Sequence, residues 1–360
     1  MGPLPHWGPL PPCHPPPPLC STSSVPRFST PLVASVLSER RGFQRIELSS
    51  GRKAYVLTEL VGPVAVGDRV VVNTTAVDLG LGTGGWDVVH WNLSRDSWSS
   101  PGPGHVMKLR YTSLQADVGA AEEALPSEPV SLGGAPVVVC QLHSQVACVA
   151  AAFKHLAPSR SLVFVMTDWG ALPVVLSDLL ADLRNGGLID SVVSAGEAFG
   201  GDYEAVNVVS GLQVGVALAG ADAVVVGPGP GVIGTGTPLG FSSLEAAAVL
   251  DAAAELGAQP ILCVRFSEAD TRDRHRGVSH HTRAALERTH GSPTAPVPIG
   301  EPGFDERATA VDVPDVAALL GASGIEVTSM GRAPEDDSGF FRYAAAAGVA
   351  AAEALEGRFS

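Results

Sequence analysis

The stretch 270–282 combines imidazole and positive charge. Its histidines are His275, His280 and His281, and its cations include Arg274 and Arg276. Imidazole binds metal ions or transfers protons near neutral pH, and guanidinium groups bind anions. Side chains of adjacent helical residues diverge by about 100°, so neighbouring histidines do not easily share one metal ion. Acid–base work or anion binding is therefore at least as strongly indicated as a metal site, and a solvated helix start is the non-functional interpretation.

A glycine-rich loop at 227–237 is the second candidate. Gly229, Gly231 and Gly234 match the G-x-G-x-x-G spacing with which dinucleotide folds bring backbone amides to a pyrophosphate. Two prolines remove amide donors, and no acidic residue closes the next strand. We expect these glycines and Thr235 to hold a phosphate or carboxylate rather than a nicotinamide cofactor. A tight turn that simply needs glycine is the structural alternative.

Further candidates follow other apolar runs. They are His143 and Ser144, then Asp168, then Gly200, Gly201, Asp202 and Glu204. His143, Asp168, His280 and His281 are the candidates for moving protons, and the others for holding a ligand. Asp168 could instead cap the helix predicted to open near Gly170. Asp202 and Glu204 would repel a phosphate, so they favour a cation, a sugar hydroxyl or an amine, and an acid from this set could complete a metal shell.

These candidates need a sheet to bring them together. Short β-branched runs alternate with alanine- and leucine-rich helical stretches, at 137–142, 162–166, 191–194, 223–226, 261–264 and 325–328, and the final helix is predicted at 340–355. This alternation is typical of βαβ units, which build a parallel sheet covered on both faces. Ligands bind such sheets beyond the carboxyl ends of the strands. We therefore expect His143, Asp168, Asp202, Gly231 and His280 to gather at one edge.

Composition divides the chain into four segments. Proline dominates 1–30, which predicts a disordered tail because proline lacks a backbone donor. Short strands between Gly, Pro and Asp at 31–111 indicate a small β-barrel-like domain. A linker at 112–135 leads into the α/β domain at 136–360. The predicted fold class is α/β, with a Rossmann-like, doubly wound parallel sheet behind a small β-rich domain.

Charge and composition narrow the classes of partner. The formal charge of −14 disfavours nucleic acid and anionic membrane surfaces, so the expected partner is a small anionic molecule. Five scattered cysteines do not form a disulfide framework, and no apolar run is long enough to span a bilayer. We expect a cytoplasmic protein that could form a homo-oligomer.

Four long motifs occur in one order along the chain, at 104–112, 195–207, 229–237 and 274–282. Together they resemble the bacterial family called domain of unknown function 3866, from about Val33 to the carboxyl end. The resemblance implies membership of that family and brings no reaction, cofactor or catalytic residue with it.

The leading hypothesis is an enzyme acting on a small anionic metabolite, of which a phosphorylated compound is one example, and the sequence does not identify the reaction. The first alternative is a non-catalytic ligand-binding or regulatory protein that uses the same crevice. A nicotinamide-dependent oxidoreductase is the further alternative. Histidines and carboxylates on neighbouring strand ends favour chemistry over binding alone.

Overall fold

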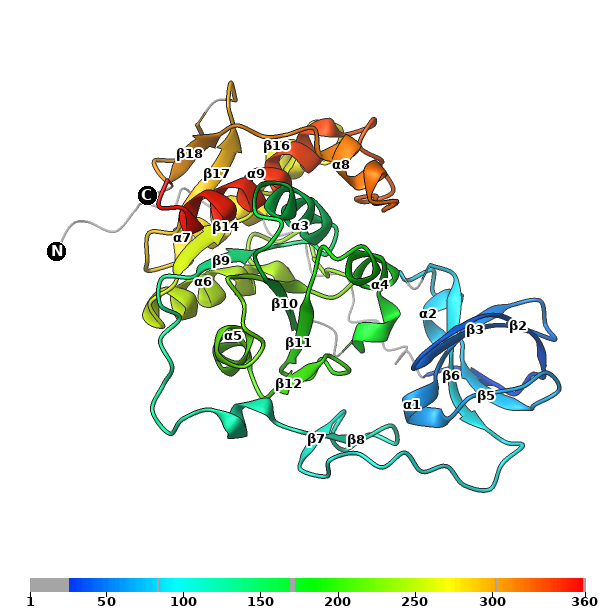
Figure 1. Ribbon diagram of the computed structural model, residues 1–360. Coiled ribbons are helices and arrows are strands. Elements are labelled where there is room, and N and C mark those ends of the chain that lie inside the picture. Colours follow the sequence, from blue (N-terminus) through cyan, green and yellow to red (C-terminus); the bar gives the residue numbers. More distant parts are fainter. Residues whose placement is uncertain (1–25, 83, 169–171, 302, 359–360) are drawn as a thin grey trace, which may run out of the picture. The chain divides into compact units, whose positions relative to one another are not determined.

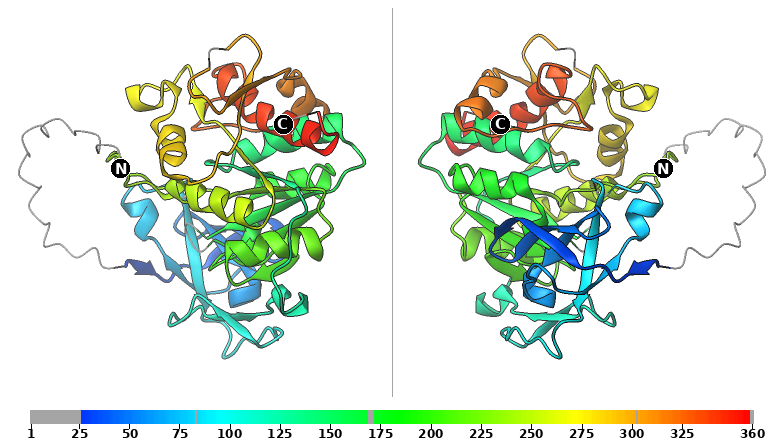
Figure 2. Two further views of the ribbon diagram at one scale, coloured as in Figure 1. Left: turned by 90° about the vertical axis from the view of Figure 1, so that its left-hand side faces the viewer. Right: turned by 90° about the vertical axis from the view of Figure 1, so that its right-hand side faces the viewer.

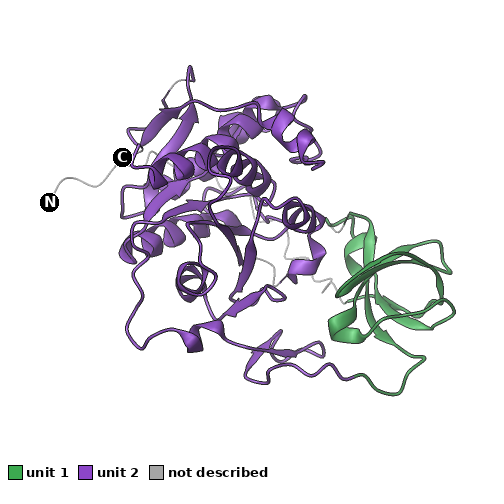
Figure 3. Cartoon of the chain, viewed as in Figure 1, with its two compact units in different colours: residues 1–98 green, residues 99–360 purple. Residues whose placement is uncertain are grey.

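The computed structural model describes residues 26–82, 84–168, 172–301 and 303–358. The chain divides into two compact units, residues 1–98 and 99–360 (Figure 3). The predicted β-rich domain extended to residue 111, but residues 99–111 belong to the second unit. Lys108 accounts for this, because its ammonium group donates to the backbone carbonyls of Gly196 and Ala205 in that unit.

The first unit contains one six-stranded sheet. Its strands, in spatial order, are β1 (Phe28–Ser29), β5 (Val70–Asn73), β6 (Trp86–Asn92), β4 (Lys53–Leu57), β3 (Phe43–Leu48) and β2 (Val33–Arg40). Two short helices, α1 (Thr58–Val61) and α2 (Thr75–Asp78), join them. The order leaves β1 and β2 at opposite ends without a ladder between them, so the sheet is not a closed barrel. The β-rich part of the prediction is confirmed.

The end of the predicted tail takes part in this sheet. Residues 1–25 lie outside the described residues. Phe28 and Ser29, however, pair with Asn73 and Val72, and the Arg27 N–H donates to Thr75 Oγ1 over 2.7 Å. Residues 28 and 29 of the predicted tail therefore belong to the sheet.

The second unit is built on a six-stranded sheet whose strands are all parallel. In spatial order these are β12 (Tyr203–Ala205), β11 (Ser191–Ala195), β10 (Leu162–Thr167), β13 (Ala223–Pro228), β9 (Pro136–Val139) and β14 (Gln259–Leu262). Their β-branched residues are buried on both faces, as in a covered parallel sheet. The predicted α/β parallel sheet is confirmed.

Helices cover both faces of this sheet (Figures 1 and 2). One apolar core contains residues of α3 (Gln145–Leu156), α4 (Asp178–Asn185), α8 (Val316–Ala322) and α9 (Ser338–Leu355). The other contains residues of α5 (Val208–Ala217), α6 (Ala246–Glu255) and α7 (His280–Arg288). The backbones of α9 and α3 approach closely at Gly348, where a Cβ would overlap the Val149 carbonyl. The predicted final helix is thus α9.

The strand order differs from that of dinucleotide-binding sheets. In that order the first strand lies between the second and the fourth. Here the first strand of the sheet along the chain, β9, lies between β13 and β14.

The predicted strand at 325–328 is wrong. Ile325 and Val327 alternate inward, but they pack on the α3 side of the core and have no ladder partner among the described residues. The remaining strands lie outside the large sheet and form three pairs. These are β7 (Val106–Lys108) with β8 (Ala116–Val118), β15 (Phe266–Ser267) with β16 (Gly277–Val278), and β17 (Ala295–Pro298) with β18 (Ala308–Val311).

Candidate functional site

A cavity of about 560 Å³ lies beyond the carboxyl ends of β9, β13 and β14. Register explains why these three loops meet: Val139 at the end of β9 pairs with Val226 of β13 and with Leu262 of β14. The residues that follow therefore leave the sheet at the same level. Predicted site residues on the cavity wall are His143, Ser144, Gly231, Gly234, Arg274, His275, His280 and His281.

The remaining predicted residues do not line this cavity. They are Asp168, Gly200, Gly201, Asp202, Glu204, Gly229 and Thr235. Gly229 is buried against Leu172 and Met166, where it serves packing. Thr235 bonds within its own loop, to Thr237 Oγ1 and the Gly240 carbonyl.

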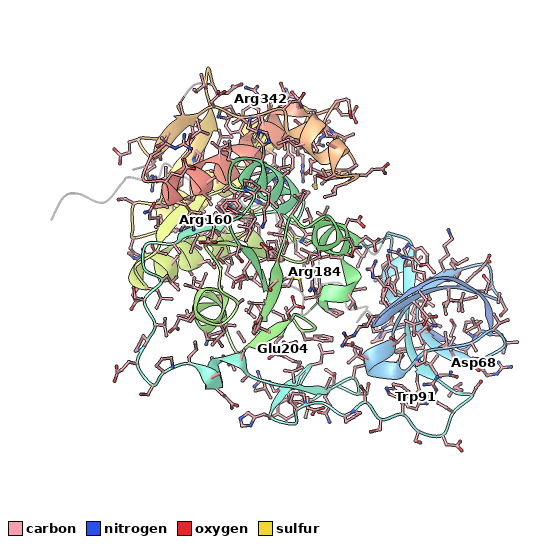
Figure 4. All side chains as sticks on the ribbon, viewed as in Figure 1. Asp68, Trp91, Arg160, Arg184, Glu204 and Arg342 are labelled. Atoms are coloured by element: carbon pink, nitrogen blue, oxygen red, sulfur yellow. The ribbon has the colours of Figure 1, made fainter. Side chains whose placement is uncertain are left out.

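Asp202 lies at the amino ends of the strands, whereas the cavity lies beyond their carboxyl ends. Its carboxylate accepts the N–H of Val192, near the start of β11, over 2.8 Å. It also pairs with Arg184, which Figure 4 shows at α4. After β11 the chain runs back to begin β12 parallel to it, with Tyr203 opposite Val193. This return places Asp202 beside the amino end of β11, so the expectation of one common edge is wrong for this residue.

Gly200, Gly201 and Glu204 belong to the same return. The Gly200 N–H donates to Glu204 Oε1 over 2.6 Å, and the Gly201 N–H donates to Ser194 Oγ. Burial raises the pKa of Glu204, whose second carboxylate oxygen lies 3.9 Å from the buried Lys108 ammonium. These contacts secure the β11–β12 turn.

Asp168 follows β10 at the carboxyl ends of the strands, but its side chain does not line the cavity. It accepts the N–H of Glu197 over 3.2 Å. The helix that the sequence predicts to begin near Gly170 falls outside the described residues. Burial, with a smaller contribution from Asp168, raises the pKa of Glu245 to about 7. Sequence reasoning missed Glu245, because nothing in the stretch before α6 marks a buried acid.

The glycine loop is a hairpin-like turn rather than a strand-to-helix turn. The Thr235 N–H bonds to the Gly240 carbonyl over 2.8 Å, and the Ser242 N–H bonds to the Ile233 carbonyl over 2.9 Å. The Ile233 N–H donates to Ser242 Oγ. Several loop amides are thus used internally, so the loop does not present the uninterrupted amides of a pyrophosphate cradle. Gly231 and Gly234 still face the cavity.

Arg265 is the unusual group on the wall. It follows the end of β14 after Cys263 and Val264, it is only 5% exposed, and it forms no ion pair with a carboxylate within the described residues. Its Nη1 donates to His281 Nδ1 over 2.9 Å. Burial lowers its pKa to about 10, so the guanidinium remains charged at neutral pH. The nearby Asp270 carboxylate favours the charged form, but it pairs with Arg272 and Arg332. A buried cation without a carboxylate in direct contact is costly, which favours binding of an anion.

Two other arginines share this wall. Arg272 makes a two-point ion pair with Asp270, with N–O distances of 2.9 and 2.7 Å. Arg274 forms no ion pair in the part of the chain that the structure describes. Glu326 is the only acid among the described lining residues. The cavity is therefore locally cationic although the chain carries a formal charge of −14.

The three histidines of the wall form a cluster that has the shape of a metal site. One ring nitrogen from each of His275, His280 and His281 lies within 4.8 Å of the others. Among the described residues no carboxylate joins this group, so Asp168, Asp202 and Glu204 do not complete a shell. Burial first, then the neighbouring arginines, lowers the pKa of His275 to about 3 and that of His281 to about 2. Both are neutral at physiological pH.

His143, on the cavity wall, connects its own loop with the end of β13 and the start of α4. Its Nδ1 lies 2.8 Å from the Pro228 carbonyl, and its Nε2 lies 2.7 Å from Ser177 Oγ. A carbonyl only accepts, so Nδ1 carries the proton and Nε2 accepts from Ser177. Ser177 also caps α4 by accepting the Leu180 N–H. Burial lowers the pKa of His143 to about 4. Both ring nitrogens are occupied, and the contacts favour a bridging role.

Sequence reasoning left several wall residues out of the candidate set. Arg265 is one of them, although its position after an apolar run in the sequence could have placed it at the carboxyl ends of the strands. Phe241 stacks on His281 with ring centroids 3.7 Å apart and planes at 3°. Nothing in the sequence pairs these two rings, because the hairpin brings Phe241 back by the bridge between Gly234 and Phe241.

No helix in the described ranges has the length and apolar composition needed to cross a membrane. The comparison with curated proteins found no match to this chain. A family model described as "Protein of unknown function (DUF3866)" matches residues 53–348, from within β4 into α9. The match includes every residue of the cavity wall and confirms the predicted resemblance. The chain is a member of the DUF3866 family.

Proposed function

We propose that the protein is an enzyme that acts on a small anionic metabolite, phosphorylated or carboxylated, held in the cavity of the second unit. The observation that carries the proposal is Arg265, a buried guanidinium on the wall without a carboxylate partner among the described residues. An anion would supply the missing partner. Arg274 adds a second cation, and the neutral His280 supplies a group able to accept a proton.

The rival function is non-catalytic binding in the same cavity, and binding measurements do not separate the two. The loop geometry and the strand order give the nicotinamide alternative no support. As part of the proposal we place the protein in the cytoplasm. Support comes from the cysteines in the described chain, Cys140, Cys148 and Cys263, which are free thiols as a reducing compartment maintains them.

A thermal-shift screen of phosphate esters and small carboxylates, each with and without divalent metal, should find a stabilising anion. Calorimetric titration then compares Arg274→Gln with Arg276→Gln. Arg276 is exposed, carries the same charge two residues away and does not line the cavity. Because a charge-assisted hydrogen bond contributes about 1.5–3 kcal/mol, Arg274→Gln should weaken binding roughly 10- to 100-fold while Arg276→Gln changes it less than about threefold.

A second variant addresses the buried cation itself. Arg265→Met removes an unpaired charge, so the ligand-free variant should unfold at the same temperature as the wild type or higher. Its response to the anion should disappear. Equal weakening by the Arg274 and Arg276 variants, or an unchanged anion response in Arg265→Met, would refute the assignment of this cavity.

A further inference from the structure

Hydrogen-bond partners fix the proton position on His281. Arg265 Nη1 lies 2.9 Å from its Nδ1, and a guanidinium has donors only. Nδ1 therefore accepts, and Ser243 Oγ lies 3.0 Å from the same nitrogen. The ring is neutral at physiological pH, because burial and then Arg265 lower its pKa to about 2. In a neutral imidazole the remaining proton sits on Nε2, which makes that nitrogen a hydrogen-bond donor.

His280 has the opposite arrangement. Its Nδ1 lies 3.3 Å from the Arg274 carbonyl, which can only accept. Nδ1 must therefore carry the proton. Burial lowers the pKa of His280 below its ordinary value, so this ring is also neutral near pH 7. Its Nε2 is left with a lone pair and is a hydrogen-bond acceptor.

Phe241 holds the two rings in place. It stacks face to face on His281 and meets His280 edge-on, with centroids 5.3 Å apart. Both histidines line the cavity, each with a ring nitrogen within 4.8 Å of the other. One ring with a donor Nε2 and one ring with an acceptor Nε2 thus lie side by side on the wall that carries Arg265 and Arg274.

We propose that the cavity selects anions that carry a hydroxyl group on a carbon close to the charged group. The Nε2–H of His281 donates a hydrogen bond to an oxygen of the anion. The Nε2 of His280 accepts a hydrogen bond from the hydroxyl group of the ligand. A simple carboxylate or a dianionic phosphate ester of an unsubstituted alkyl chain has no proton for His280 and would leave its lone pair facing negative charge. The inference rests on the proposed anion site and adds the class of ligand.

The same protonation argument bears on a divalent metal at the three histidines. A metal ligand needs a free lone pair, and the neutral His281 has one nitrogen protonated and the other occupied by Arg265. The positive charges of Arg265, Arg272 and Arg274 stand on the same wall and repel a cation. The contacts therefore favour a hydroxylated anion over a metal ion.

Matched ligand pairs test the proposal at pH 8, where a phosphate ester is dianionic. Calorimetry compares glycerol 3-phosphate with propyl phosphate, and lactate with propionate. The wild type should bind the hydroxylated member about tenfold or more tightly, the effect of one well-placed hydrogen bond. His280→Leu should reduce that ratio to below about twofold. The unsubstituted member should bind this variant as tightly as the wild type or more tightly, because no lone pair then faces its charge. Arg274→Gln should weaken both members alike and keep the ratio.

These outcomes separate the two proposals. If no member of either pair binds, the anion site itself fails; if both members bind wild type equally, only the hydroxyl preference fails. Stoichiometric binding of Zn²⁺ that is lost in His281→Leu would also overturn the inference, because His281 would then be a metal ligand.

The tautomers of His280 and His281 are also measured directly in the wild-type protein, without a variant that could misfold. In wild-type protein with ¹⁵N-labelled histidine, nitrogen chemical shifts distinguish the two neutral forms. The expected result is a proton on Nε2 of His281 and on Nδ1 of His280. The reverse assignment for either ring would refute the donor–acceptor pair.

Discussion

Acid should destabilise the second unit through His143. Its imidazole bridges the Pro228 carbonyl and Ser177 Oγ as the neutral form, and burial lowers its pKa from 6.5 to about 4. Between these values the unfolded chain binds more protons than the folded one. Stability from this group is therefore fully present above pH 6.5 and is lost as the pH falls towards 4. At pH 5 the loss relative to pH 8 is about 2 kcal/mol.

The variant His143→Gln isolates this contribution. Its amide can donate to Pro228 and accept from Ser177, but it does not titrate. Urea unfolding of the wild type and the variant should be compared at pH 5, 6, 7 and 8. The variant should be the less stable protein at pH 8, and the gap should narrow by about 2 kcal/mol by pH 5. His155→Gln, an exposed histidine on the last turn of α3, is the control. A constant gap between His143→Gln and wild type would mean that His143 is not held neutral by burial.

Two further comparisons use matched changes. Gly231 has φ +112° with open space around it, so Gly231→Ala should lower the free energy of unfolding by about 1–2 kcal/mol through backbone strain alone. Gly234→Ala places a Cβ in ordinary contact, 3.5 Å from Phe241, and should change the free energy of unfolding by less than about 0.5 kcal/mol. Loss of the anion-induced thermal shift in a stable Gly234→Ala protein would therefore assign the loop to the site, and a normal shift would exclude it. Removal of residues 1–25 should leave the melting temperature within about one degree, and removal of 1–30 should lower it by several degrees because β1 is lost. Equal melting temperatures for the two truncations would show that β1 contributes nothing measurable.

The parallel sheet and part of the cavity wall were predictable, because the β-branched runs show where the strands end. His143 and Gly231 follow β9 and β13, whose registers align at Val139, and no side-chain detail was needed to bring them together. His280 opens α7, after the β15–β16 pair. Asp202 shows the limit of this reasoning. It follows a strand, but the next strand starts without a helical crossover, so the return of the chain carries the carboxylate to the opposite edge.

The roles of individual residues were less predictable, because they depend on partners distant in sequence. His143 resembled a proton carrier until the structure placed Ser177 and Pro228 on its two nitrogens. The stretch 325–328 had the alternation of a strand, yet its inward residues pack on a helical layer. Burial alternation alone does not show whether a neighbouring strand is present to pair with the backbone.

The net charge of the chain and the local charge of its cavity act on ligands over different distances. A total of −14 acts over long range and disfavours large polyanions, whose many charges would meet repulsion over the whole surface. A small anion in a cavity of about 560 Å³ interacts mainly with the groups that line it, where Arg265 and Arg274 face one acid, Glu326. Low local polarity strengthens those short-range interactions. An acidic protein can therefore exclude polyanions and still hold a small anion, and the unpaired Arg265 gives the folded chain a free-energy reason to bind one.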